Sequence, residues 1–174
     1  MTPIPLGILD FPTAGGTHEL IETIDVASNV ASVTFSNISQ DFEMLELTYN
    51  LDNSSSTDIV AYQNAGNVSN SASFVTGATT APTSDYELNN YAIIGRTHSD
   101  TGNTGIGRII FHKYNSTSYG TGFFGVYSKP DRESGWLSGI YNDTVAMTSL
   151  QITVLAGNVN AGSRISLFGI RGAA

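Results

Sequence analysis

Residues able to carry acid–base, nucleophilic or metal chemistry are few in this chain and widely separated. The three histidines, His18, His98 and His112, have none of the short spacings that bring ligands together in a zinc site. The chain has no cysteine, which removes thiolate ligands and cysteine nucleophiles. It also has no Gly-x-Ser-x-Gly turn to present a serine nucleophile. The sequence therefore predicts no metal site, no cofactor and no enzymatic activity.

Two predicted loops carry oxygen ligands of the kind that calcium prefers. Asp85, Asp100 and Asn103 lie in them, but they lack the Asp-x-Asp-x-Asp-Gly spacing of a calcium-binding loop. Aspartate and asparagine are common in turns because their side chains hydrogen-bond to the backbone two residues on. We interpret these residues as turn formers.

The densest charge in the chain lies in the sequence Lys-Pro-Asp-Arg-Glu-Ser-Gly-Trp, residues 129–136. Asp131 and Glu133 are the nearest approach to the paired carboxylates that glycoside hydrolysis requires. Lys129 precedes these carboxylates, Arg132 lies between them and Trp136 follows them. This pattern is more typical of a solvated loop with local ion pairs. A loop of this kind also suits contact with a partner protein.

The overall composition excludes several classes of partner. Only 13% of the residues are charged, against about 25% in an average soluble domain, and the net charge is −8. Nucleic acid is not expected as a partner because its phosphates need clustered Lys and Arg. No stretch approaches the roughly 18 apolar residues that span a bilayer, and no secretion signal is visible. Serine, threonine, asparagine and glycine fill the surface instead, as in rigid building blocks of large assemblies.

Residues 1–17 are expected to form an extended arm ahead of the domain. Pro3, Pro5 and Pro12 disfavour a helix, and Gly15 with Gly16 provides a hinge. The arm is too apolar for a free tail, so it should pack on its own domain or on a neighbouring subunit. Its candidate contact residues are Ile4, Leu6, Ile8, Leu9 and Phe11.

Short alternating apolar runs follow the arm and predict strands. Leu20, Ile24 and Val26 fall on one alternation, and Ile165 shares a face with Leu167 near the end of the chain. Roughly eight to ten strands are expected, near residues 20–26, 33–35, 44–49, 58–62, 91–94, 108–114, 122–127, 136–141, 150–154 and 164–171.

The strand at residues 44–49 has the clearest pattern, with Leu45, Leu47 and Tyr49 directed inward and Glu46 and Thr48 outward. Residues 64–90 are expected to form a long loop with one short strand near residues 73–75. The many short strands and the absence of helical periodicity predict an all-β, antiparallel sandwich of the jelly-roll type. The arm at 1–17 and one sandwich domain at 18–174 make up the chain.

Both ends of the chain resemble a known group of proteins. Residues 3–9 (Pro-Ile-Pro-Leu-Gly-Ile-Leu), the strand–turn–strand at 19–38 and the closing stretch at 152–171 resemble the small β-sandwich family of tailed-phage virion structural proteins. The resemblance covers about the first fifty and the last twenty-five residues. It implies a non-enzymatic protein of the virion, made in the bacterial cytoplasm.

The resemblance implies a capsid decoration, or cement, protein on the head surface. Its partners would be the major capsid protein and further copies of itself in a homotrimer, through the arm residues and the cluster at 129–136. The alternative is a tail fibre or tip module that binds a host glycan with loops from the middle region, 55–145. A secreted adhesin is less consistent with the sequence, which has no visible signal. The tyrosines weighed for a sugar surface are Tyr86, Tyr91, Tyr119, Tyr127 and Tyr141.

Overall fold

The computed structural model describes residues 18–64, 70–77, 82–89, 91–97, 105–129 and 133–172, and at 70–77, 82–89 and 133 it describes the backbone alone. The described residues form twelve strands. They are β1 His18–Asp25, β2 Ser32–Ser36, β3 Met44–Leu51, β4 Thr57–Gln63, β5 Asn70–Gly77, β6 Pro82–Asn89, β7 Ala92–Thr97, β8 Gly105–His112, β9 Thr121–Lys129, β10 Glu133–Tyr141, β11 Ser149–Val154 and β12 Arg164–Ile170.

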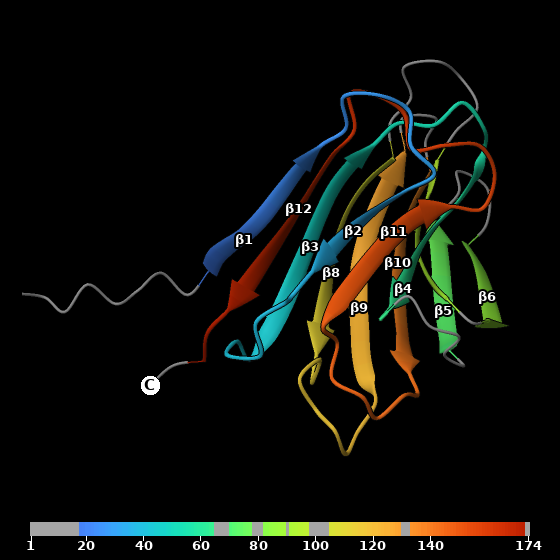
Figure 1. Cartoon of the computed structure of the whole chain (residues 1–174). Helices are drawn as coiled ribbons and strands as arrows, with labels where there is room; N and C mark the ends of the chain where they lie inside the picture. The colour runs from blue at the N-terminus through green and yellow to red at the C-terminus, as the bar shows by residue number, and fades with distance from the viewer. Residues whose placement is uncertain are drawn as a thin grey trace, which may run out of the picture.

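These strands form two antiparallel sheets that pack face to face, which confirms the predicted all-β sandwich (Figure 1). The larger sheet has the order β1-β12-β3-β8-β9-β10-β5-β6, and the smaller has the order β2-β11-β4-β7. Two antiparallel pairs, β5–β6 and β9–β10, widen the larger sheet on one side. The other eight strands are divided equally between the two layers. No membrane-spanning helix occurs in the part of the chain that the structure describes.

The prediction for residues 64–90, a long loop with one short strand near residues 73–75, was right about that strand, which lies within β5, but wrong about the rest. β5 and β6 lie within this range and pair along their whole length, from Asn70 opposite Asn89 to Gly77 opposite Pro82. β5 also pairs with β10. A ladder of backbone hydrogen bonds needs no alternating apolar side chains. Because these residues are mostly small and polar, the period of two that predicts a strand is weak here.

The prediction that Leu20 shares a face with Ile24 was also wrong. The register of β1 shifts between Leu20 and Glu22, where a bulge inserts an extra residue. Leu20 therefore lies opposite Phe168, while Ile24 lies opposite Ile165. Because one extra residue reverses the side to which later side chains point, Leu20 is left exposed on the outer face of the sheet.

The core lies between the two sheets. Leu45, Leu47 and Tyr49 of β3 are buried as predicted, and so are Ile165 and Leu167 of β12. Their outward neighbours on β3 and β12 lie on the opposite side of the larger sheet. The period of two seen in the sequence therefore assigns the inner and outer faces of β3 and β12 correctly.

Two buried tyrosines connect the layers across the core. Tyr49 donates its hydroxyl proton to the Ile94 carbonyl at 2.6 Å, and Tyr141 donates to the Ala61 carbonyl at 3.0 Å. Burial raises the pKa of both phenols far above the usual value. Both tyrosines therefore remain protonated donors at any ordinary pH.

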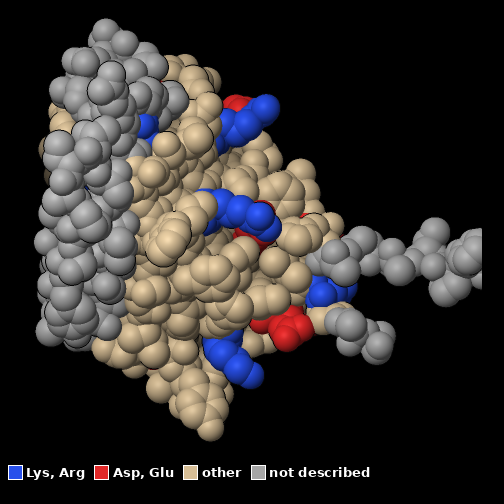
Figure 2. Space-filling view, turned by 180° about the vertical axis from the view of Figure 1, so that it is seen from behind, with Lys and Arg blue, Asp and Glu red and all other residues tan. Residues whose placement is uncertain are grey.

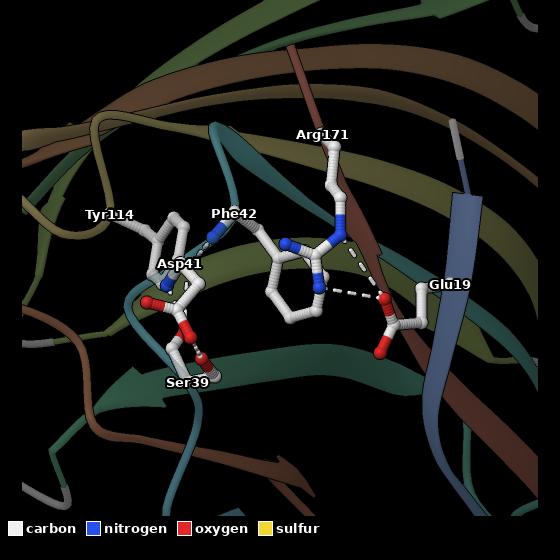
Figure 3. A network of polar contacts seen from close by, with 6 residues as sticks. All are labelled: Glu19, Ser39, Asp41, Phe42, Tyr114 and Arg171. Carbon is white, nitrogen blue, oxygen red and sulfur yellow. Dashed lines mark hydrogen bonds and ion pairs between the residues drawn. The ribbon is translucent and has the colours of Figure 1, made fainter. Parts of the chain in front are cut away.

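One end of the larger sheet is held by a network around the loop between β2 and β3 (Figure 3). The Arg171 guanidinium lies 4.7 Å from the centre of the Phe42 ring and donates to Glu19 at 2.9 Å. The Tyr114 hydroxyl donates to the Ser39 carbonyl and accepts the Phe42 amide. The start of β1 is thereby fixed to the edge of the sheet.

Candidate binding face

The outer surface of β8, β9 and β10 carries large hydrophobic side chains that remain in contact with solvent. Trp136 is 70% exposed, Phe124 51%, Ile106 50%, Val126 49% and Ile140 37%. We call this surface the β8–β10 face. It consists of the outward residues Ile106, Arg108, Ile110, His112, Gly122, Phe124, Val126, Ser128, Ser134, Trp136, Ser138 and Ile140.

The register of the three strands makes these hydrophobic residues neighbours. Val126 lies opposite both Arg108 and Trp136, and Phe124 lies opposite Ile110. Side chains at such cross-strand positions are about 5 Å apart at Cβ and in contact. The exposed residues therefore form one continuous patch of hydrophobic side chains across three strands.

Figure 2 shows the molecule from behind, where blue groups, several of them next to a red one, lie scattered among tan atoms. Arg108 is the one Lys, Arg, Asp or Glu among the outward residues of the β8–β10 face that the structure describes. Ring stacking adds to the apolar character, because the His112 and Phe124 rings lie 5.3 Å apart and nearly parallel. The face is therefore largely apolar, and its one described arginine is paired with Glu46 of the neighbouring strand.

A hollow of about 410 Å³ opens on this face. Ile106, Arg108, Val126 and Ser128 border it, and Gly107 lies at its floor. A Cβ atom at Gly107 would lie 2.3 Å from the Tyr49 hydroxyl oxygen, so glycine is required there by the tyrosine beneath. The hollow has the size and lining to accept an apolar side chain from a docked segment.

The single cation of the face is tied to the neighbouring strand. Arg108 Nη2 donates to Glu46 Oε2 at 2.6 Å, and His18 Nε2 lies 3.1 Å from the same oxygen. The Glu46 side chain is only 8% exposed although it points away from the core. Burial alone would raise its pKa, but the hydrogen bonds from Arg108 and His18 outweigh burial and lower the pKa. Glu46 is therefore a carboxylate at neutral pH.

The structure separates two residues of the predicted contact cluster. Lys129 ends β9 with its side chain on the inner side and is 9% exposed, whereas Trp136 points outward from β10. Glu133 pairs with Lys129 through the backbone. The alternation of a strand places Lys129 and Trp136 on opposite faces of the sheet. Lys129 instead borders a polar hollow of about 320 Å³ that also contains the ion pair of Asp58 and Arg96.

Several predicted residues lie outside the described part of the chain. The positions concerned are Ile4, Leu6, Ile8, Leu9 and Phe11 of the arm, Asp131 and Arg132 of the charged cluster, and His98, Asp100 and Asn103 among the weighed ligands. Of Asp85 and Tyr86 the backbone alone is described. Within the described ranges no three His, Asp or Glu side chains gather as a metal site would require.

The tyrosines weighed for a sugar surface do not meet on one face. Tyr127 and Tyr141 are buried in the sandwich, out of reach of a ligand at the surface. Tyr91 is partly buried, with its ring 5.8 Å from that of Tyr62. Tyr119 is 71% exposed, in the loop between β8 and β9.

The sequence analysis placed Trp136 in its contact cluster but did not single out the other exposed hydrophobic residues of the face, Ile106, Phe124, Val126 and Ile140. The signal for them lies in the strands themselves, where apolar residues occupy both alternations, as in Gly-Phe-Phe-Gly-Val-Tyr of β9. A strand with only one buried face should be polar on the other. No protein-family model matches the chain, and a search of curated proteins finds no relative.

Proposed function

We propose that this protein is a non-enzymatic structural component of a tailed-phage virion, most specifically a decoration protein that binds the outer surface of the head. The observation that carries the proposal is the continuous apolar β8–β10 face on an otherwise well-packed sandwich. Such a surface serves contact with another protein. The resemblance at residues 3–9, 19–38 and 152–171 directs the choice of partner toward the capsid.

The strand order supports the same proposal. Without the pairs β5–β6 and β9–β10, the sheets read β1-β12-β3-β8 and β2-β11-β4-β7. We take this as the jelly-roll order, with two inserted hairpins. Jelly rolls recur in viral capsid and lectin domains. The inserted β9–β10 pair supplies two of the three strands of the apolar face, so the insertion itself creates the candidate binding surface.

The mechanism of decoration would be burial of the β8–β10 face against the shell. Buried apolar area contributes roughly 25 cal/mol per Å² before association costs are subtracted. The hollow beside Arg108 would seat one apolar side chain of the shell. Association of the protein into a homotrimer would place three such faces on one particle surface and multiply the affinity through avidity.

The proposal is tested by counting the copies of this protein in virions of the phage whose genome encodes it. Quantitative mass spectrometry of purified particles should find hundreds of copies per virion, in a fixed ratio to the major capsid protein. Removal of the protein should lower the temperature at which the heads release their DNA. Absence of the chain from the particles would overturn the proposal.

The exposed aromatic rings favour one second candidate, a tail module that binds a host glycan. Trp136 and Phe124 present ring faces at the surface, and sugars stack on such faces. A count of a few copies per particle, together with binding of purified protein to host polysaccharide, would identify this function instead.

A further inference from the structure

We infer that the polar hollow beside Lys129 is a binding site for one neutral sugar unit of a glycan. The hollow has a volume of about 320 Å³ and is bordered by Ser56, Thr57, Asp58, Arg96 and Lys129. This volume lies at the lower end of the range of small-molecule sites, about 300–1,000 Å³. The inference goes beyond the proposed function, because it concerns a different part of the molecule from the β8–β10 face.

Strands from both layers bring these residues together. Asp58 lies opposite Arg96 in the ladder of β4 and β7, within the smaller sheet. Lys129 is the last residue of β9, in the larger sheet, and its side chain lies on the inner side. β7 packs against β9 across the two layers. The hollow is therefore formed where the two sheets meet, by residues that share no motif in the sequence.

The chemistry of the border favours a ligand that both donates and accepts hydrogen bonds. The Arg96 guanidinium and the Lys129 ammonium can only donate, the carboxylate of Asp58 can only accept, and the hydroxyls of Ser56 and Thr57 can do both. An inorganic anion would be repelled by the carboxylate, and a metal ion would be repelled by the two cations. A sugar meets neither repulsion, because each of its hydroxyls can donate to the carboxylate and accept from the cations.

The Asp58–Arg96 pair presents this chemistry at an accessible depth. Arg96 Nε donates to Asp58 Oδ1 at 2.9 Å, and the two side chains are 29% and 23% exposed. The bond engages one carboxylate oxygen, and among the residues that the structure describes none donates to the other, Oδ2. Arg96 and Lys129 also have other interactions, so a sugar hydroxyl would join an existing network rather than supply the first partner of either cation.

The burial of Lys129 is the second observation that points to a ligand. The residue is 9% exposed, and lysine is rarely buried to this extent because removing an ammonium group from water is costly. Sites for small molecules use a few polar or charged groups of this kind to fix the orientation of the ligand.

The wall of the hollow is held in one conformation by the chain itself. The Thr97 hydroxyl donates to the Ser55 carbonyl at 2.7 Å, and the Ser56 hydroxyl donates to the Thr97 carbonyl at 3.3 Å. The Leu155 amide donates to the carbonyl of Asp58 at 3.1 Å. A preformed wall lowers the entropic cost of binding a small ligand.

The inference is tested by titrating the full-length protein with the methyl glycosides of glucose, galactose, mannose and N-acetylglucosamine. The Nε–H signal of Arg96 in ¹H–¹⁵N spectra, identified by its loss in Arg96→Lys, should move with at least one of the four. Asp58→Asn should raise the dissociation constant of that glycoside about tenfold or more, because it removes a charged acceptor. No response of the Arg96 signal to any of the four would overturn the inference.

Asp25→Asn is the matched control, because it removes the same charge from an exposed aspartate–arginine pair outside the hollow. It should bind the glycoside as the wild type does, and equal weakening in both variants would overturn the inference. Thermal unfolding shows whether each variant is folded. Should Asp58→Asn prove unstable, Ser56→Ala removes one hydroxyl from the loop before β4 and should weaken binding severalfold; unchanged affinity in that variant would count against the site.

The only tryptophan distinguishes the hollow from the β8–β10 face. Trp136 lies on that face, so a sugar bound in the hollow should leave its fluorescence unchanged, and a change in emission would place the sugar on the face and overturn the inference. Binding by a protein that is absent from virions would retain the sugar site and remove the capsid as the partner. A protein present at hundreds of copies, with no response to the glycosides, would retain the proposed function and remove the sugar site.

Discussion

The outer face of the larger sheet has two halves that differ in how their side chains are satisfied. On the half formed by β1, β12 and β3, neighbours pair with one another: Arg164 donates to both oxygens of Asp25 at 2.6 and 2.9 Å, and Thr23 lies within hydrogen-bond distance of Ser166. On the half formed by β8, β9 and β10, Trp136 and the hydrophobic residues around it are left in solvent.

One continuous sheet therefore carries two kinds of outer surface. On one, polar side chains pair with each other; on the other, hydrophobic side chains remain exposed to solvent. The polar pairs of the first half need nothing beyond their own chain, because each of these charges and hydroxyls has a neighbour, and Leu20 is the large exposed hydrophobic residue described there. The apolar half gains free energy only when something else covers it. We therefore propose the binding function for the half whose hydrophobic side chains remain exposed, and the sharpest experiments are those that treat the two halves differently.

The largest difference should appear when the apolar half is made polar. The double variant Trp136→Thr/Val126→Thr keeps strand propensity through its β-branched residues but removes the centre of the face. We expect binding to phage heads that lack the protein to weaken by about 30-fold or more, as for a central interface residue. Leu155→Thr, an exposed hydrophobic residue outside the face, should bind normally. Equal loss in both variants would show that the face has no special role.

A smaller effect, on folding alone, should follow from filling the floor of the face. Gly107→Ala places a methyl group 2.3 Å from the Tyr49 hydroxyl oxygen, so the tyrosine must shift and strain its bond to Ile94. We expect a loss of about 2 kcal/mol in the free energy of unfolding, measured in urea. Gly122→Ala is the matched control on the adjacent strand, because an added Cβ there meets no atom within 4 Å. A stable Gly107→Ala protein would contradict the packing described for Tyr49.

The smallest effect should come from the border between the halves, where Glu46 joins Arg108 and His18. Glu46→Gln should cost about 1 kcal/mol at pH 7, since both partners are half exposed and solvent weakens the pairing. Because folding lowers the pKa of Glu46, its contribution is complete above the unfolded pKa, about 4.3, and is lost as the pH falls through the lower folded pKa.

The difference in melting temperature between wild type and Glu46→Gln should therefore close on acidification below that value. Asp25→Asn breaks the exposed pair with Arg164 on the polar half and should leave the melting temperature unchanged at neutral pH in ordinary salt. If the difference in melting temperature between wild type and Glu46→Gln stays constant down to strongly acid pH, the charge of the carboxylate contributes nothing to stability.

Much of the sandwich follows from alternation in the sequence. Leu45, Leu47 and Tyr49 of β3 and the pair Ile165 and Leu167 of β12 were assigned to the core from their spacing, and all are buried. The hairpin of β8 and β9 was also predicted and is confirmed by its register. These predictions succeed because a strand packed on one side repeats its apolar residues with a period of two.

The predictions fail where the partner strand, and not the local pattern, sets the outcome. β5 and β6 lack a clear apolar face and exist through their pairing with each other and with β10. Leu20 is turned outward by a bulge that depends on the register with β12. Trp136 and Lys129 are close in sequence, yet the register of β9 with β10 leaves them on opposite faces of the sheet.

The sequence by itself determined an all-β chain with few charged groups, a clear inner face on its strongest strands and an apolar segment ahead of the domain. Only the tertiary structure decided which apolar residues remain outside, because that depends on strand order and register rather than on composition. β9 carries hydrophobic residues on both sides, and nothing local says which side meets the second sheet. Its place in the larger sheet buries Phe123 and Tyr127 against the smaller sheet and leaves Phe124 and Val126 exposed to solvent.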